Sequence, residues 1–361
     1  MRIGINGLVL KKENSGIGNY TIHVINQMAD MTDDELILFV MASKPIRPLI
    51  NPKIKIVGLF PYETNRYLKV LVEQLLLNRQ IKKQKIDMLF CPAFTMPILK
   101  VCKTVIVVHD MIYKLKIDGS SKLKDWYSNF LFSRSIKKAD QIITVSTATK
   151  TDLKRYFPNR KNIHVIHLGS SMKEYKTKKP PKAINSDEKF ILMTGTMTPR
   201  KNIDRALEAL SQIGNKTDIK LLLAGGVSKK SQATLQKISD TNLTDRVIVA
   251  GFLTDEELAW CYENAEMLLF CSIYEGFGLP PLEAMRHNLP VIASNVTSIP
   301  EVVGDAALMV NPYSVDQIAD GIMELLTHDD LKQELIKKGK ERVKLFSWEK
   351  TAEETLKVLK N

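Results

Sequence analysis

The sequence predicts an α/β protein built from two Rossmann-like domains. Short apolar strands alternate with helical patterns along the chain, which is typical of parallel sheets that helices cover on both faces. The alternation occurs twice, on either side of a polar, proline-containing stretch at residues 175–188. The length of 361 residues agrees with two domains, since one domain holds roughly 150 residues.

The first half is expected to form a parallel sheet within a domain at residues 1–178. Helical periodicity at Tyr67–Ile81 and at Leu123–Ile136 separates some of its strands. The expected strands are Ile3–Asn6, Leu36–Val40, Met88–Phe90, Val105–Val108, Ile142–Val145 and His164–His167.

The second half is expected to repeat this arrangement within a domain at residues 188–340. A helix is expected at Asn202–Leu210, and residues 341–361 end in an amphipathic helix that Ser347 caps. The expected strands are Phe190–Thr194, Ile219–Ala224, Val247–Ala250, Met267–Cys271 and Val291–Ala293.

The composition excludes several classes of protein. With 44% hydrophobic and 25% charged residues, the chain is an ordinary globular sequence rather than a disordered or collagen-like one. The first residues already form an expected strand, and no apolar stretch approaches about 18 residues, so we expect neither a secretory signal nor a membrane span. Four cysteines lack metal-ligand spacing, which favours reduced thiols in a cytoplasmic protein: Cys91, Cys102, Cys261 and Cys271.

The positive charge is concentrated in the first half of the chain. The net charge is +12, and residues 1–180 hold 31 lysines and arginines against 14 acidic residues, whereas the remainder hold 21 against 26. A phosphorylated substrate, an anionic membrane surface or a nucleic acid would each match this imbalance, and so would a merely solvated lysine-rich surface. No nucleic-acid recognition motif accompanies the charge, so we expect no nucleic-acid partner.

The richest candidate segment lies at residues 274–285, directly after an expected buried strand. Its glycines, Gly276 and Gly278, permit close approach of a ligand, and the N-terminus of the helix that starts near Leu279 favours an anion. Glu275 and Glu283 flank this turn, and paired carboxylates of this kind can serve sugar hydroxyls, a metal ion or acid–base chemistry.

Three further groups of residues follow strands in the same way. Arg200 and Lys201 lie at a strand-to-helix junction and could neutralise a diphosphate, although a charged loop alone is weak evidence. Gly16 and Gly18 lie in the first strand-to-helix connection but lack the third glycine of a dinucleotide fingerprint. His109 follows a buried strand at the edge where ligands gather in open α/β sheets.

Several common catalytic motifs are absent from the sequence. There is no Gly-x-x-x-x-Gly-Lys-Ser/Thr, no Gly-x-Ser-x-Gly and no His-Glu-x-x-His, which excludes P-loop enzymes and the common hydrolases. Without an Asp-x-Asp pair, we expect no metal, so cations and helix N-termini would stabilise a diphosphate.

Taken together, these residues resemble the GT4-type family of retaining glycosyltransferases, which have the GT-B fold. The resemblance is most specific in Glu275–Glu283, which matches the Glu-x7-Glu motif, and extends from Gly16 to about Trp348. Ser294–Ala307 is an equally specific match, and supporting matches are Gly195–Asn202, Gly251–Leu258 and Phe346–Trp348. The style of the motifs is similar to that of bacterial polysaccharide mannosyltransferases.

The resemblance implies two Rossmann-like domains that face each other across a cleft. The C-terminal domain would hold a nucleotide sugar, the N-terminal domain would receive the acceptor, and the final helix would return to the N-terminal domain. The implied roles are catalysis by Glu275 and His109, diphosphate binding by Arg200, Lys201, Gly16, Gly18, Gly278 and Leu279, ribose binding by Glu283, and base binding by Phe252 and Leu253.

The chain departs from the family pattern at three positions. Thr196 replaces an arginine found in many members, so Arg200 and Lys201 would carry the phosphate contacts alone. Asn19 replaces a frequent arginine after Gly-Ile-Gly. Asn288 replaces a usual glycine, and asparagine tolerates the left-handed conformation of a helix C-cap.

We therefore expect a retaining, metal-independent transferase that moves a hexose from a nucleoside-diphosphate sugar to a glycan or lipid-linked glycan in cell-surface polysaccharide assembly. GDP-mannose is favoured over a UDP-sugar as the donor. The basic first half suits peripheral association with the inner face of the cytoplasmic membrane. A sugar-nucleotide epimerase of the same fold and a non-catalytic partner subunit remain as alternatives.

Overall fold

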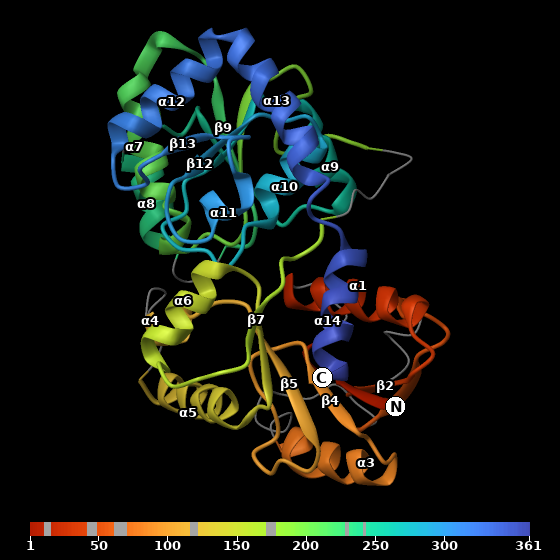
Figure 1. Ribbon diagram of the computed structural model, residues 1–361. Coiled ribbons are helices and arrows are strands. Elements are labelled where there is room, and N and C mark those ends of the chain that lie inside the picture. Colours follow the sequence, from red (N-terminus) through yellow and green to blue (C-terminus); the bar gives the residue numbers. More distant parts are fainter. Residues whose placement is uncertain are drawn as a thin grey trace. The chain divides into compact units, whose positions relative to one another are not determined.

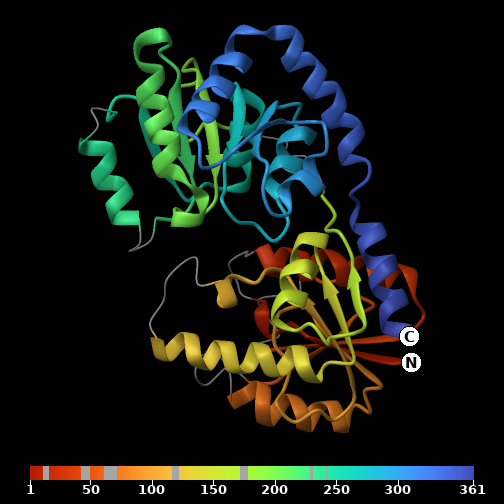
Figure 2. The ribbon, with the colours of Figure 1, turned by 60° about the vertical axis from the view of Figure 1, so that its left-hand side comes forward.

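The computed structural model describes residues 1–10, 16–41, 49–60, 71–115, 122–170, 178–227, 231–240 and 243–361. The chain divides into two compact units: the first consists of Met1–Gly169 and Ser347–Asn361, and the second of Ser170–Phe346 (Figures 1 and 2). The sequence placed these boundaries at residues 178 and 341, whereas the contacts place them at Gly169 and Phe346. Part of the expected linker, residues 171–177, lies outside the described residues.

The first unit contains a parallel seven-stranded sheet in the order β3-β2-β1-β4-β5-β6-β7. In its register, Ile5 of β1 pairs with Leu38 on one side and with Phe90 on the other. Such strands are buried on both faces, which is why they read as continuous apolar runs. The strands are β1 (Arg2–Asn6), β2 (Glu35–Val40), β3 (Lys55–Gly58), β4 (Met88–Cys91), β5 (Lys103–Val108), β6 (Gln141–Thr144) and β7 (Ile163–Val165).

Helices connect these strands and cover the sheet. The described ones are η1 (Gly7–Val9), α1 (Gly16–Met31), the π-helical segment η3 (Val72–Leu77) that continues into α3 (Asn78–Lys83), α4 (Ile112–Leu115), α5 (Lys122–Lys138), α6 (Thr147–Tyr156) and α14 (Trp348–Lys360). Within this part of the chain, and within the rest of the described residues, no helix is both long and apolar enough to cross a membrane.

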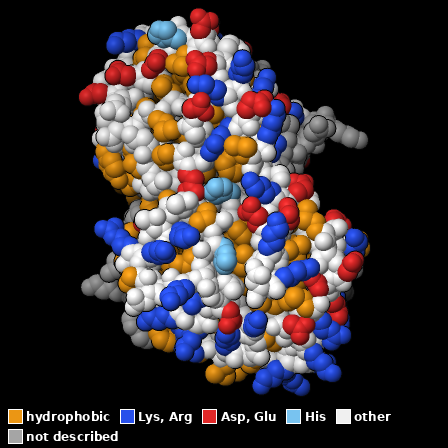
Figure 3. Space-filling model, in the orientation of Figure 1, with side chains coloured by type: hydrophobic (Ala, Val, Ile, Leu, Met, Phe, Trp, Pro, Cys, Tyr) orange, Lys and Arg blue, Asp and Glu red, His pale blue; other side chains and the backbone are white. Residues whose placement is uncertain are grey.

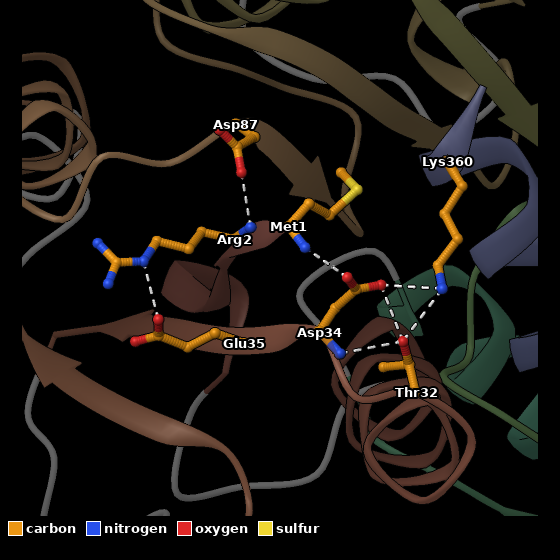
Figure 4. A network of polar contacts seen from close by, with 7 residues as sticks. All are labelled: Met1, Arg2, Thr32, Asp34, Glu35, Asp87 and Lys360. Atoms are coloured by element: carbon orange, nitrogen blue, oxygen red, sulfur yellow. Dashed lines mark hydrogen bonds and ion pairs between the residues drawn. The ribbon is translucent and has the colours of Figure 1, made fainter.

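The last helix, α14, belongs to the first unit and runs beside α1 in Figures 1 and 2. Trp348 stacks on His23 of α1 with ring centroids 4.9 Å apart, and the Thr351 hydroxyl donates to the carbonyl of His167 at 2.8 Å. At the other end, Lys360 Nζ lies 2.9 Å from the carboxylate of Asp34 (Figure 4). The C-terminal helix therefore packs against α1 within the first unit.

The second unit contains a parallel six-stranded sheet in the order β10-β9-β8-β11-β12-β13. The strand order reverses between β8 and β11, and ligands bind at the carboxyl ends of strands at such a reversal. The strands are β8 (Phe190–Thr194), β9 (Lys220–Ala224), β10 (Val247–Gly251), β11 (Met267–Phe270), β12 (Val291–Ser294) and β13 (Leu308–Val310).

Helices cover both faces of this sheet, and aliphatic side chains from them and from the strands form one buried core. The helices are η4 (Pro199–Lys201), α7 (Ile203–Ile213), η5 (Gly214–Lys216), α8 (Gln232–Asp240), α9 (Asp255–Asn264), α10 (Leu279–Arg286), α11 (Ile299–Val303), α12 (Val315–Thr327) and α13 (Asp329–Val343). Asn288, just after α10, has a φ of 58°, so the expected left-handed conformation at this position is confirmed. The prediction of two Rossmann-like domains is confirmed as well.

Candidate active site

The candidate site of the second unit is built around the loop that joins β11 to α10. Gly278 precedes the helix with a φ of 125°, and a Cβ atom there would lie 3.0 Å from Ile299 Cδ1, so a side chain would be strained. The hydroxyl of Ser298 lies 2.9 Å from the carbonyl oxygen of Glu275 and 2.6 Å from that of Phe277. The turn is thus held from the neighbouring helix α11 in a fixed shape.

One carboxylate oxygen at this loop binds two cations. Glu275 Oε1 lies 2.7 Å from Lys201 Nζ and 2.8 Å from Arg200 NH1. Lys201 is 8% exposed, and its ammonium lies 4.8 Å from the ring centroid of Phe270. A Cβ at Gly195 would approach Lys201 Cε to 2.9 Å, so the glycine leaves the room that this buried lysine occupies.

The cations determine the ionisation of Glu275. Burial alone would raise the pKa of Glu275, but Lys201 and Arg200 more than offset that effect and the pKa is lowered. The three side chains form a compact, ionised group at the carboxyl edge of the sheet. A ligand phosphate could take the place of the carboxylate beside the two cations.

The two basic residues are positioned by a short 3-10 turn between β8 and α7. Asn202 ends this turn with a φ of 60°, and its side-chain amide donates to the carbonyls of Cys271 at 3.0 Å and Pro312 at 2.6 Å. In return, the amide of Ile273 donates to the carbonyl of Arg200 at 2.9 Å. These contacts join the loop after β8 to the loop after β11. They bring Arg200 and Lys201 of the first loop next to Glu275 of the second.

Glu283, on α10, is the second carboxylate of the site. Burial raises the pKa of Glu283, while a hydrogen bond from Tyr262 of α9 opposes that rise. The Tyr262 hydroxyl donates to Glu283 Oε2 at 2.8 Å. The two carboxylates therefore have different surroundings and opposite pKa shifts, because Glu275 is paired with cations and Glu283 is hydrogen-bonded to a phenol.

Phe252 and Leu253 follow β10 at the same edge of the sheet. Phe252 is 82% exposed, an unusual state for a large apolar side chain, and its ring lies 3.7 Å from where a Cβ of Gly226 would be. The loops after β8, β9 and β10 are hydrogen-bonded to one another, from Gly195 to Ala224 and from Gly225 to Gly251. The exposed ring is thus a neighbour of the loop that carries the basic residues.

The structure places the remaining predicted residues in the first unit. His109 follows β5, and its Nε2 lies 2.8 Å from the carbonyl oxygen of Pro92. Burial lowers the pKa of His109 to about 4, so its imidazole is neutral at pH 7. Gly16 is the exposed first residue of α1, and Gly18, two residues further along, is buried.

Sequence reasoning missed three residues that support the site: Tyr262, Ser298 and Asn202 as a bridging side chain. Each acts through hydrogen bonds to segments distant in sequence, for which the sequence carries no local signal. All four cysteines are free thiols, and among the described residues no group of three His, Cys, Asp or Glu side chains is placed to hold a metal ion.

Comparison with protein families matches both halves of the chain. The family described as glycosyltransferase family 4 matches residues 14–172, and the family described as glycosyl transferases group 1 matches residues 174–342.

Curated relatives are similar over part of their length. O-antigen chain mannosyltransferase B of Escherichia coli is 32% identical over 63% of this chain and 62% of that protein. The serotype-specific mannosyltransferase WbdA of Escherichia coli is 30% identical over 69% of this chain and 32% of that protein. The chain thus spans less than two thirds of the length of these relatives.

Solved structures share the fold at low sequence identity. Sucrose-phosphate synthase from Thermosynechococcus elongatus has a TM-score of 0.79 at 21% identity, over 99% of this chain and 98% of that one. Anabaena HepE, determined with UDP and glucose, has a TM-score of 0.74 at 15% identity, over 100% and 99% of the two chains.

Proposed function

The chain belongs to the GT4-type family of glycosyltransferases, and from this premise we propose that it transfers a mannosyl group from a nucleoside-diphosphate sugar to a hydroxyl of a glycan or lipid-linked glycan. The acceptor would be part of a cell-surface polysaccharide under assembly. GDP-mannose is the favoured donor and a UDP-sugar the next candidate. The names of the relatives, which are mannosyltransferases of O-antigen chains and serotype-specific polymers, support the choice of sugar.

The observation that carries the proposal is the convergence of Arg200 and Lys201 on Glu275 at the strand-order reversal. A departing diphosphate needs preorganised positive charge, and here two cations lie beside the N-terminus of α10. Gly278 and Leu279 would bring backbone amides to the same phosphates. Glu275 would exchange the cations for a sugar hydroxyl when the donor is bound.

The other end of the donor would lie toward Glu283 and the β10 loop. A carboxylate is a suitable acceptor for the two hydroxyls of a ribose, and the exposed ring of Phe252 with Leu253 offers an apolar surface to a base. In the first unit, the neutral imidazole of His109 can exchange a hydrogen bond with a sugar hydroxyl. Gly16 leaves open space for a phosphate at the start of α1, where Gly18 would also bind it.

We propose a retaining reaction without a resident metal. The bond between the anomeric carbon and the diphosphate oxygen breaks first, and the electron pair leaves with the diphosphate, which Arg200 and Lys201 stabilise. The acceptor oxygen then bonds to the anomeric carbon on the same face. Its proton passes to the leaving phosphate, so the products are a glycoside and a nucleoside diphosphate.

The test is release of nucleoside diphosphate from a panel of GDP-, UDP- and dTDP-sugars in the presence of a chelator, with a lipid-linked glycan as acceptor. We expect release from one donor, with Glu275→Gln slowing it by about 100-fold, because a charged group that touches the donor is removed. Glu188→Gln is the matched control, since Glu188 is ion-paired with Lys220 at the amino end of β8, away from the site. Release that Glu275→Gln leaves unchanged would overturn the assigned site, and complete dependence on an added metal ion would overturn the metal-free mechanism.

A further inference from the structure

The carboxylate of Glu283 has one hydrogen-bond donor among the described residues, the hydroxyl of Tyr262. This bond uses one acceptor position of Oε2 at 2.8 Å and leaves Oε1 and the second lone pair of Oε2 to accept from a ligand. Tyr262 is 3% exposed, so the bond lies in a water-poor environment where a charge-assisted hydrogen bond is strong.

Contacts other than Glu283 hold the ring of Tyr262 in place. It stacks on the imidazole of His287, with centroids 5.5 Å apart and planes inclined by 11°. His287 Nδ1 in turn lies 3.4 Å from the carboxylate of Glu263, which also pairs with Lys178. The phenol is therefore fixed from its far side before any ligand binds.

The ionisation states fix the direction of the hydrogen bond. Burial raises the pKa of Tyr262 well above its usual value, so the phenol keeps its proton and is the donor. Burial also raises the pKa of Glu283, and the hydrogen bond from Tyr262 opposes this rise. Of the other charged groups that face Glu283, Asp255 adds to the rise and Lys201 opposes it.

We propose that Tyr262 is a positioning residue for nucleotide binding: it holds the Glu283 carboxylate so that both hydroxyls of a ribose can donate to it, and the pair selects ribonucleotides over 2′-deoxyribonucleotides. The inference rests on the proposed function, because Glu283 binds a ribose only if this unit binds a nucleotide. A carboxylate held ionised offers an acceptor to each of the two hydroxyls. A nucleotide without the 2′-hydroxyl leaves part of a buried charged acceptor unpaired, which is a strong basis for rejection.

The experiment measures binding rather than transfer, by calorimetry on the full chain with GDP, UDP and their 2′-deoxy counterparts. Tyr262→Phe removes one oxygen and keeps the ring that stacks on His287. We expect it to weaken ribonucleotide binding about tenfold, the effect of one hydrogen bond to a charged group, and 2′-deoxyribonucleotide binding clearly less. The ratio of ribonucleotide affinity to 2′-deoxyribonucleotide affinity should therefore be smaller in Tyr262→Phe than in the wild-type chain.

A pH series separates positioning from simple packing. Without the hydrogen bond the pKa of Glu283 rises further, so in Tyr262→Phe the protonated, non-binding form persists to higher pH and the loss of affinity is larger at mildly acidic than at neutral pH. In a Glu283→Gln background, Tyr262→Phe should have little further effect. Tyr156→Phe removes an exposed phenol hydroxyl from the first unit and should leave all affinities unchanged.

The outcomes keep the two proposals apart. Suppose that the wild-type chain binds a nucleoside diphosphate, but that Tyr262→Phe lowers the affinities for ribonucleotides and 2′-deoxyribonucleotides equally or lowers neither. The role of Tyr262 is then overturned while the proposed function stands. If the wild-type chain binds none of the four nucleotides, the proposed function itself is overturned.

Discussion

At the scale of single residues, the ion cluster of Glu275 has two consequences, one for chemistry and one for stability. Its carboxylate offsets two cations, one of which, Lys201, is nearly inaccessible to water. A buried cation that loses its partner is costly, so the carboxylate of Glu275 also stabilises the folded chain.

This predicts a pH-dependent effect of Glu275→Gln on the free energy of unfolding. The pKa of Glu275 is lower in the folded chain than its ordinary value. The stabilisation is therefore fully present above that ordinary value, about 4.3, and is lost as the pH falls through the lowered folded value. At neutral pH we expect the variant to be less stable by about 3 kcal/mol, the cost of removing one partner from a largely buried pair.

Urea unfolding at neutral pH and at a pH below the folded value of Glu275 measures this effect. The difference between wild type and variant should shrink at the acidic pH, because the wild-type carboxyl is then neutral too. A difference that stays the same at both pH values would contradict the role of the ion cluster. Glu188→Gln, which removes a more exposed pair, should change little at either pH.

The sequence singled out charged residues that the structure brings together, but not the residues that hold them. Glu275, Glu283, Arg200 and Lys201 lie in motifs at strand ends, where a single sequence carries a signal. Asn202 instead bonds to carbonyls 69 and 110 residues away. Contacts between residues so far apart in sequence depend on the tertiary fold, and no local sequence pattern predicts them.

At the scale of elements, α14 illustrates a helix whose pattern was clear and whose partner was not. Ser347 caps it as expected, since its hydroxyl accepts from the amide of Lys350 at 3.2 Å. One face is buried, with Trp348, Ala352 and Leu359 packed toward α1. The amphipathic pattern predicts a buried face, but only the fold shows that the face covers the N-terminal unit.

We expect Leu359→Ala to destabilise the first unit. Leu359 is completely buried, and truncation of such a leucine leaves a cavity that costs about 2–5 kcal/mol in the free energy of unfolding. Glu353→Ala on the exposed face of the same helix is the control and should change little. Chemical unfolding of both variants measures these changes in the free energy of unfolding. If both changes are equally small, α14 contributes nothing to the stability of the first unit.

Both strands that the sequence missed are edge strands, although the partly exposed edge strands β7 and β10 were predicted. Central strands such as β1 and β5 are almost fully buried and appear in the sequence as apolar runs. The missed strands, β3 and β13, are short edge strands with partly exposed residues. Edge strands have only one neighbour and need less apolar surface, so their sequences resemble loops.

At the scale of the whole molecule, the alternation of strands and helices was sufficient to predict two parallel sheets, but composition did not locate the boundary between the units. The polar stretch at residues 175–188 contains the usual linker residues, yet the contacts divide the chain at Gly169. A Cβ at Gly169 would lie 2.3 Å from the amide nitrogen of Trp348, so this position is packed tightly against the returning chain. Tight packing of this kind cannot be predicted from the amino-acid composition.

The uneven charge is a property of the whole chain, and it leads to the last prediction. Lys82, Lys83 and Lys85 are exposed at the end of α3, and Figure 3 shows lysine and arginine side chains gathered on that end of the first unit. Each lysine near an anionic bilayer contributes about 1 kcal/mol, so replacement of all three by alanine should weaken binding to phosphatidylglycerol-containing vesicles by about 100-fold at low salt. The matched control replaces three exposed lysines at the C-terminal end of α13 in the second unit: Lys337 and Lys340 within the helix and Lys344 just after it.

Vesicle flotation at low and high salt separates the possible outcomes, because screening by salt should remove the binding that the α3 lysines provide. Vesicles of phosphatidylcholine alone should not bind either protein. Equal binding by the two triple variants would mean that the first unit's charge acts as a solvated surface or meets the phosphates of the substrate instead. Loss in the α3 variant alone would place the basic end of the first unit at the membrane, where the proposed lipid-linked acceptor would be held.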